Sequence, residues 1–376
     1  MKLKLTVLAA LTAIAAVGTA SAQDMQVVKI GHMSPLSGGQ AHYGKDNSNG
    51  AKMAIEDLNA QNLVIGGKKI KFELVDEDDG ADPKQGPIVA TKFCDMKVNG
   101  VVGALNSGVT LPASSVLNKC GIPQITGAAT NPSITKQGFK NFFRVIANDN
   151  AIGGGMALFA AKTGAKNIAV IDDRSAYGQG VADIFADVAK KNGITILANE
   201  YTTDKAVDFT AILTSIKAKK PDAIFFGGMD PQAGPMMRQM EQLGMANVRV
   251  FAGDGPCTEK LVELSGKSKT LDGFFCGDGG ESIAKMPGGT EWKKRYDAKY
   301  PGQFQVYSPM VYDAVMVLAD SMKRAKSVDP MVYVSEISKT NMKGVTGTIA
   351  FDATGEILTP GITISGFKTG KKVALN

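Results

Sequence analysis

Apolar and polar positions alternate along most of the chain in two patterns that follow each other in turn. Short apolar runs such as 98–105 and 223–226 have the length and composition of buried strands. Longer stretches such as 178–192 carry apolar residues three or four positions apart, which predicts amphipathic helices. Strands that alternate with helices of about 10–15 residues predict parallel sheets built of right-handed βαβ units.

The same patterns predict the order of elements along the chain. Strands or extended segments are expected at 27–30, 69–75, 98–105, 124–126, 141–146, 168–171, 194–202, 223–226, 248–252 and 271–276. Helices are expected at 44–59, 83–96 with Asp82 as N-cap, 110–119, 150–163, 178–192, 209–219, 231–243, 258–264, 291–300, 308–326 and 331–339. Two hairpin-like strands, 347–351 and 361–368, are expected to end the chain. These strands are too many for one ordinary sheet, so we expect an α/β protein with two doubly wound domains.

Small polar residues gather where several of the predicted strands end. Ser107 and Thr130 each follow a strand and are expected to precede a helix, where free N–H groups and the helix dipole favour a carboxylate or phosphate. Simple N-capping is the alternative for each hydroxyl. Asp254, between two glycines at another strand end, could bind an ammonium group or serve as a turn residue. Ligands of parallel sheets bind at such strand ends, which makes these residues candidates for one site.

The first 22 residues have the composition of a secretory signal peptide. Lys2 and Lys4 precede an apolar run at 5–17, and Ala-Ser-Ala at 20–22 matches a cleavage signal. The run is short for a membrane anchor, which is the alternative, so we expect an exported protein that begins at Gln23. The formal net charge is only +6, and no basic block is interleaved with aromatic residues, so no nucleic-acid partner is expected.

Export changes the interpretation of the four cysteines, which are Cys94, Cys120, Cys257 and Cys276. An even number in an oxidising compartment predicts two disulfides with three possible connectivities. The pairs Cys94–Cys120 and Cys257–Cys276 are preferred because each lies within neighbouring elements, and buried free thiols are the alternative. The only histidines are His32 and His42, and no phosphate-binding loop is present. A catalytic triad, a metal site and a cofactor are therefore not expected, and an enzyme is the disfavoured alternative.

Segments 33–44 (Met-Ser-Pro-Leu-Ser-Gly-Gly-Gln-Ala-His-Tyr-Gly) and 50–59 resemble the N-terminal signature of the leucine/isoleucine/valine-binding protein family. Members of this family are the periplasmic substrate-binding components of branched-chain amino acid ABC transporters. Further matches continue the resemblance over essentially the whole mature chain, at 82–85, Ser107 with 112–114, 128–130, 177–180, 209–213 and 226–228. The resemblance implies a monomeric, non-catalytic periplasmic protein whose partners are a small-molecule amino acid and the permease subunits of an ABC importer.

The resemblance also implies an architecture, the type I periplasmic binding protein fold, with two parallel-sheet lobes and three hinge crossings. Lobe 1 would comprise 25–146 and 278–356, and lobe 2 would comprise 148–276 and 358–376. The crossings would fall near Ala147, Gly277 and Ile357. The ligand would bind in the cleft between the lobes, and closure would trap it.

Position by position, the resemblance assigns roles around that cleft. Ser107 and Thr130 would bind the α-carboxylate, and Asp254 would bind the α-ammonium group. Leu105 and Ala128 would contribute backbone groups to the same carboxylate site. The remaining expected pocket residues are Tyr43, Tyr177 and Tyr307, together with Asn106 and Met229, where relatives carry cysteine and tyrosine.

A branched-chain amino acid, or one with a similar apolar side chain, is the expected ligand. Amides, urea-like compounds and aromatic acids are alternatives on the same scaffold, and Asp254 favours a ligand with a cationic group. The sensory domain of a receptor is a further alternative.

Overall fold

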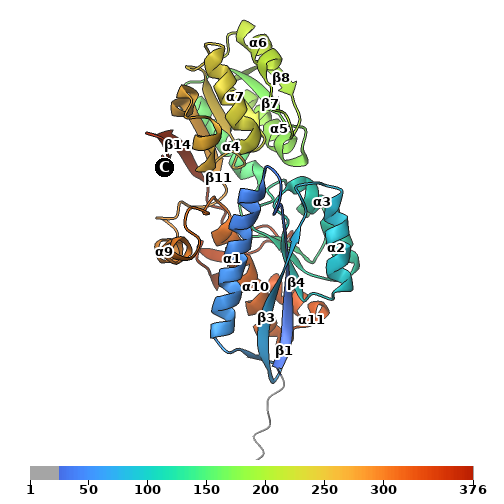
Figure 1. Cartoon of the computed structure of the whole chain (residues 1–376). Helices are drawn as coiled ribbons and strands as arrows, with labels where there is room; N and C mark the ends of the chain where they lie inside the picture. Colours follow the sequence, from blue (N-terminus) through green and yellow to red (C-terminus); the bar gives the residue numbers. More distant parts are fainter. Residues whose placement is uncertain (1–24, 376) are drawn as a thin grey trace, which may run out of the picture.

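Two separate sheets, each with its own helices, organise the chain (Figure 1). The computed structural model describes residues 25–375, so the predicted signal peptide at 1–22 lies outside the described part. The mixed α/β architecture with predominantly parallel sheets confirms the expected fold class. Among residues 25–375, no helix is both long and apolar enough to cross a membrane.

The first sheet has the strand order β2-β3-β1-β4-β5-β6 and is parallel except for the pair β2 and β3. Its strands are β1 Met25–Ser34, β2 Val64–Ile65, β3 Lys68–Asp78, β4 Gly100–Gly103, β5 Gln124–Thr126 and β6 Phe142–Arg144. The associated helices are α1 Ala41–Ala60, α2 Gln85–Asp95, α3 Ser107–Lys119, α9 Gly289–Lys299, α10 Ser308–Ala325 and α11 Pro330–Ile337. Val101 and Val102 in β4 point to opposite faces and belong to different apolar clusters, so the sheet has a core on each side.

The second sheet has the order β15-β14-β11-β10-β9-β7-β8, with β14 and β15 as an antiparallel edge. Its strands are β7 Asn167–Asp172, β8 Thr195–Tyr201, β9 Ala223–Gly227, β10 Arg249–Ala252, β11 Phe274–Asp278, β14 Thr363–Lys368 and β15 Lys371–Ala374. The helices of this part are α4 Asp149–Lys162, α5 Ala176–Lys191, α6 Thr210–Ala218, α7 Asp230–Gln242 and α8 Lys260–Leu264. Ile168 and Ile171 again separate into different clusters, as expected for a sheet covered on both faces.

Several expected element boundaries are wrong, and two of them have a clear physical reason. Helix α2 begins at Gln85 because Asp82 closes a turn before it, with its side chain accepting from the Lys84 N–H and its carbonyl from the Gln85 N–H. The expected strand at 271–276 begins as a short 3-10 helix, η2 Lys269–Gly273, since an apolar run of this length is compatible with either form.

The last two expected strands do not pair with each other. Strand β13 Thr348–Ala350 pairs with β12 Asn341–Lys343, whereas β14 pairs with β11 and β15. The chain therefore runs from the first sheet to the second after β6, returns after β11, and crosses again before β14. The first two crossings touch, because the Ala147 N–H donates to the Gly279 carbonyl at 3.0 Å. The hinge positions and lobe boundaries inferred from the family resemblance stay predictions.

Both expected disulfides are present. Cys94–Cys120 joins the ends of α2 and α3, and Cys257–Cys276 joins the loop after β10 to β11. Their Cα–Cα distances, 6.1 and 5.5 Å, lie in the ordinary range for disulfides. None of the cysteines among the described residues is free, so the alternative of buried thiols is wrong.

Candidate functional site

The strand ends that carry the predicted site residues meet between the two sheets. β4 and β5 are adjacent and parallel, so the segments that follow them leave the sheet at the same edge. A hydrogen bond joins these segments, in which the Asn131 N–H donates to Ser107 Oγ at 3.2 Å. Ser107 and Thr130 therefore lie side by side, each almost fully buried at 1% exposure.

Ser107 is the first residue of α3, which begins three residues earlier than expected. The helix can start here because the Asn106 carbonyl accepts hydrogen bonds from the N–H groups of Val109 and Thr110. N–H groups in the first turn of a helix have no partner within the helix, and they carry the positive end of its dipole. The Ser107 hydroxyl already accepts one bond and still has its own proton to donate. This end of α3 is therefore suited to an anionic group.

Thr130 does not precede a helix as expected. The chain turns instead, and only a short 3-10 helix, η1 Thr135–Gln137, follows. Its hydroxyl is buried without a hydrogen-bond partner among the described residues. The turn is held by the buried Arg144 guanidinium, which donates to the carbonyls of Ala129 at 2.5 Å and Asn131 at 3.1 Å. Glu356 fixes the guanidinium in a bidentate pair at 2.8 and 2.9 Å.

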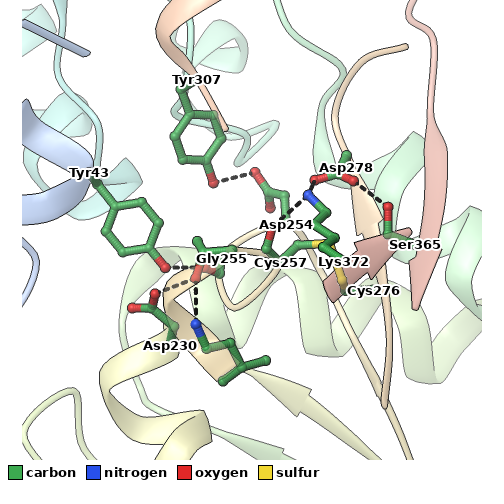
Figure 2. The surroundings of a disulfide bond; sticks show 12 residues. Tyr43, Asp230, Asp254, Gly255, Cys257, Cys276, Asp278, Tyr307, Ser365 and Lys372 are labelled. Carbon is green, nitrogen blue, oxygen red and sulfur yellow. Dashed lines mark hydrogen bonds and ion pairs between the residues drawn. A yellow bond between two sulfur atoms is a disulfide. The ribbon is translucent and has the colours of Figure 1, made fainter. Parts of the chain in front are cut away.

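Asp254 follows β10 on the other side of the site. Its carboxylate oxygens accept hydrogen bonds from the hydroxyls of Tyr177 at 2.8 Å and Tyr307 at 2.9 Å (Figure 2). The next residue, Gly255, donates its N–H to the Tyr177 hydroxyl at 2.7 Å and accepts from the Tyr43 hydroxyl through its carbonyl. Three of the predicted aromatic residues therefore converge on the short segment that contains the acid.

Burial raises the pKa of Asp254 to about 6, although the hydrogen bonds from Tyr177 and Tyr307 oppose this effect. A carboxylate in this setting gains from a nearby cation. Gly255 permits the close approach, since a Cβ there would lie 2.8 Å from the Tyr177 ring and 2.8 Å from the Met229 sulfur.

The segment that contains Asp254 is also held by a lysine, an ion pair and a disulfide. Lys372 Nζ donates to the Cys257 carbonyl at 2.6 Å and pairs with Asp278 at 2.6 Å (Figure 2). The Cys257 N–H donates to the Asp254 carbonyl at 3.0 Å, and the disulfide to Cys276 ties the same residue to β11. The acid is therefore placed by a strand, a disulfide and an ion pair together.

A small cavity lies at the centre of these groups. Eight of the ten predicted site residues line it: Leu105, Asn106, Ser107, Ala128, Tyr177, Met229, Asp254 and Tyr307. The other two are buried nearby: the Tyr43 ring lies beside the Tyr307 ring, and Thr130 precedes Asn131, whose N–H donates to Ser107 Oγ. The cavity volume is about 10 Å³, which is room for about one water molecule, so a larger ligand can enter only when the two sides move apart. Within residues 25–375, no group of His, Cys, Asp or Glu is arranged to hold a metal ion.

Asp149, the first residue of α4, is a buried acid that sequence reasoning missed. Its N–H donates to the Thr130 carbonyl at 2.9 Å, and neither carboxylate oxygen has a partner among the described residues. Burial, with the charge of Asp254 as the next contribution, raises the pKa of Asp149 to about 8, although the nearby Thr130 hydroxyl and the charge of Arg144 oppose this effect. A carboxylate at a strand-to-helix junction was the available signal, but such residues usually serve as helix caps.

Replacing Asp149 with asparagine should remove part of the pH dependence of stability. A carboxyl whose pKa is higher in the folded state holds a proton that the unfolded chain has lost, so stability falls as pH rises from about 4 to 8. One such group contributes a slope of up to about 1.4 kcal/mol per pH unit. Urea unfolding at several pH values should show a shallower decline for Asp149→Asn than for wild type.

The exposed neighbour Asp187 provides a matched control in the same part of the chain. Asp187→Asn should leave the decline unchanged. Other buried carboxyls with a raised pKa, such as Asp79, contribute equally to all three proteins and drop out of the comparison. Identical slopes for wild type and Asp149→Asn would contradict the prediction.

Comparisons with known proteins show which proteins this chain resembles. The family model described as "Periplasmic binding protein" matches residues 27–371. A Leu/Ile/Val-binding protein homologue of Brucella suis is 34% identical over 368 residues, which cover 96% of this chain and 95% of the relative. The Leu/Ile/Val-binding protein BraC3 of Rhizobium johnstonii is 31% identical over 355 residues, covering 92% and 93% of the two chains.

Solved structures extend the similarity to the fold. The leucine-binding protein LivK of Thermotoga maritima has a TM-score of 0.85 and 28% identity, over 93% of this chain and 98% of that one. The branched-chain amino acid transporter substrate-binding protein LivJ of Streptococcus pneumoniae, solved with isoleucine, has a TM-score of 0.82 and 27% identity, over 93% and 99%. The match of the family model over most of the chain, the similarity to these relatives and the shared fold show that this protein belongs to the periplasmic binding protein family.

Proposed function

We propose that this protein is the periplasmic solute-binding component of an ABC importer, and that it binds an amino acid between its two lobes and delivers it to the permease. One observation carries the proposal: a helix start with Ser107 and the Asp254 carboxylate line the same cavity, the first from the side of the first sheet and the second from the side of the second sheet. The first suits an α-carboxylate and the second an α-ammonium group, so the pair matches a zwitterion.

The electrostatics of the site also support a ligand with a cationic group. Asp254 and Asp149 are both buried, and the charge of Asp254 is the second contribution, after burial, to the raised pKa of Asp149. An ammonium group near the two acids would stabilise both in their charged form. Ser107 lies on the first-sheet side and Asp254 on the second-sheet side, so a zwitterion has both charges satisfied only when the lobes close. Ligand binding would thereby drive closure.

The remaining wall of the cavity favours an apolar side chain. Leu105, Ala128 and Met229 are each at most 5% exposed, and they line the cavity beside the rings of Tyr177 and Tyr307. Such a surface selects by shape and apolar contact. Leucine, isoleucine and valine, which the names of the relatives mention, fit this description.

Isothermal titration calorimetry with leucine, isoleucine and valine is the direct test. At least one of the three should bind with one site per chain and should raise the melting temperature of ligand-stripped protein. A panel with the corresponding amides, urea and benzoate tests the alternative ligands. Binding of an amide or an aromatic acid in preference to every amino acid would overturn the proposed substrate class.

A further inference from the structure

The two histidines of the chain have different structural settings. His32 in β1 contacts Asp76 in the adjacent strand β3 at 2.6 Å, so this pair lies within the first sheet. His42 in α1 contacts Asp230 at the start of α7, with 2.9 Å between Nε2 and Oδ2. Because α1 packs with the first sheet and α7 with the second, the His42 pair connects the two halves of the molecule.

Asp230 is held in a position that calls for a cationic partner. Its carboxylate is fully buried, whereas the His42 ring is 18% exposed. One carboxylate oxygen accepts from both His42 and the Thr258 hydroxyl, the latter at 2.6 Å, and the other oxygen has no partner among the described residues. The start of α7 stabilises the negative charge through the helix dipole. A buried carboxylate with so few donors is better satisfied by a charged histidine than by a neutral one.

We propose that His42 and Asp230 are positioning residues that join the two lobes in the closed form, and that their ion pair strengthens ligand binding as pH falls. The inference rests on the proposed function, since it assumes that closure accompanies binding. When the lobes separate, Asp230 loses this partner and His42 faces water. A charged imidazole therefore favours the closed form over the open one.

The other titratable groups near the His42–Asp230 pair stay neutral or balance one another in charge. The Tyr43 ring lies 4.2 Å from the His42 ring, and Figure 2 shows the Asp230 carboxylate beside the Tyr43 hydroxyl. Burial and the charge of Asp230 raise the pKa of Tyr43 well above its ordinary value, so this neighbour stays neutral. Tyr307 also stays neutral, because burial raises its pKa and the charge of Asp230 adds a smaller contribution in the same direction. The cavity that Pro231 lines also holds two acids and two bases, Asp82, Asp204, Lys84 and Lys205, so its formal charges balance.

The test measures ligand affinity at two pH values in wild type and His42→Gln. Glutamine can still donate a neutral hydrogen bond to Asp230 but cannot become charged. We expect His42→Gln to bind leucine about as tightly as wild type at pH 8 and about five- to tenfold more weakly at pH 5.5. Protonation of Asp254 affects both proteins alike, so the ratio of their dissociation constants isolates His42.

His32→Gln is the matched control, because it removes the other histidine pair without touching the contact between the lobes. Its affinity ratio to wild type should be the same at both pH values. Asp230→Asn should reproduce the His42→Gln result, and the double variant should add no further loss. An affinity ratio for His42→Gln that does not change with pH, in a protein that binds leucine, would overturn the inference and leave the proposed function intact.

A spectroscopic measurement on the leucine-bound protein tests the contact directly. With only two histidines, NMR can follow both ring signals. At pH 5.5 the His42 ring signals should differ between leucine-bound wild type and leucine-bound Asp230→Asn, and the His32 signals should not. If no amino acid binds, the proposed function fails. If leucine binds and the His42 signals of the two proteins are identical, the ion pair is refuted and the proposed function stands.

Discussion

Replacing Asp254 with asparagine should weaken the binding of leucine by about 100-fold or more. Asp254 is 1% exposed, and within residues 25–375 the side-chain donors to its carboxylate are the hydroxyls of Tyr177 and Tyr307. Breaking a buried ion pair by neutralising one member costs about 3–5 kcal/mol, because the other charge stays buried without compensation. Asparagine has nearly the same shape and can still accept one tyrosine hydrogen bond, so the loss reports on charge and not on packing.

A pair of ligands makes this prediction specific. Leucine and 4-methylpentanoate differ only in the ammonium group, so wild type should strongly prefer leucine. Asp254→Asn should lose affinity for leucine and keep whatever affinity wild type has for 4-methylpentanoate. The exposed Asp272 in the same half supplies the control, and Asp272→Asn should bind both ligands as wild type does. Calorimetry that finds leucine bound equally by wild type and Asp254→Asn would rule out the ammonium role.

Replacing Arg144 with methionine should lower the free energy of unfolding by about 3–5 kcal/mol. The guanidinium is fully buried and is the common donor to Glu356 and to the carbonyls of Ala129 and Asn131. Its removal leaves the largely buried Glu356 carboxylate without a cation and leaves two carbonyls without their donor. Because those carbonyls flank Thr130, binding of an amino acid should also weaken.

Urea unfolding measures the effect of Arg144→Met. Two further variants show whether the loss comes from the buried ion pair. Arg144→Met combined with Glu356→Gln should recover part of the loss, since the uncompensated charge is then gone. Arg324→Met removes a partly exposed arginine that pairs with Asp320 and Glu336, and it should cost no more than about 1 kcal/mol. Equal losses for Arg144→Met and Arg324→Met would contradict the structural role of the buried pair.

The regular parts of the fold could be predicted from sequence because each depends on local pattern. The apolar run of β9 and the helical spacing of α5 specify their elements through burial alone. The disulfide pairs could be predicted because both join neighbouring elements. The strand pairing at the end of the chain could not be predicted. The partner of β14 is β11, and nothing in the local sequence of either strand identifies its partner.

The site was predictable to the extent that it lies at strand ends and matches a family pattern. Ser107 and Asp254 meet this description, and the structure places both on one cavity. Asp149 and Asp230 do not, because an acid at a helix start has the same appearance whether it caps the helix or faces a cleft. Only the three-dimensional arrangement shows that both acids are buried with incomplete hydrogen bonding.

The small size of the central cavity has a consequence for the empty protein. If the lobes close as proposed, closing without a ligand would bury Asp254 and Asp149 with room for about one water molecule between the walls. This desolvation would make the empty closed form uphill in free energy, and each 1.4 kcal/mol would reduce its population about tenfold. A membrane partner that responds only to the closed shape would then rarely bind the empty protein, even when the proposed ligand is scarce.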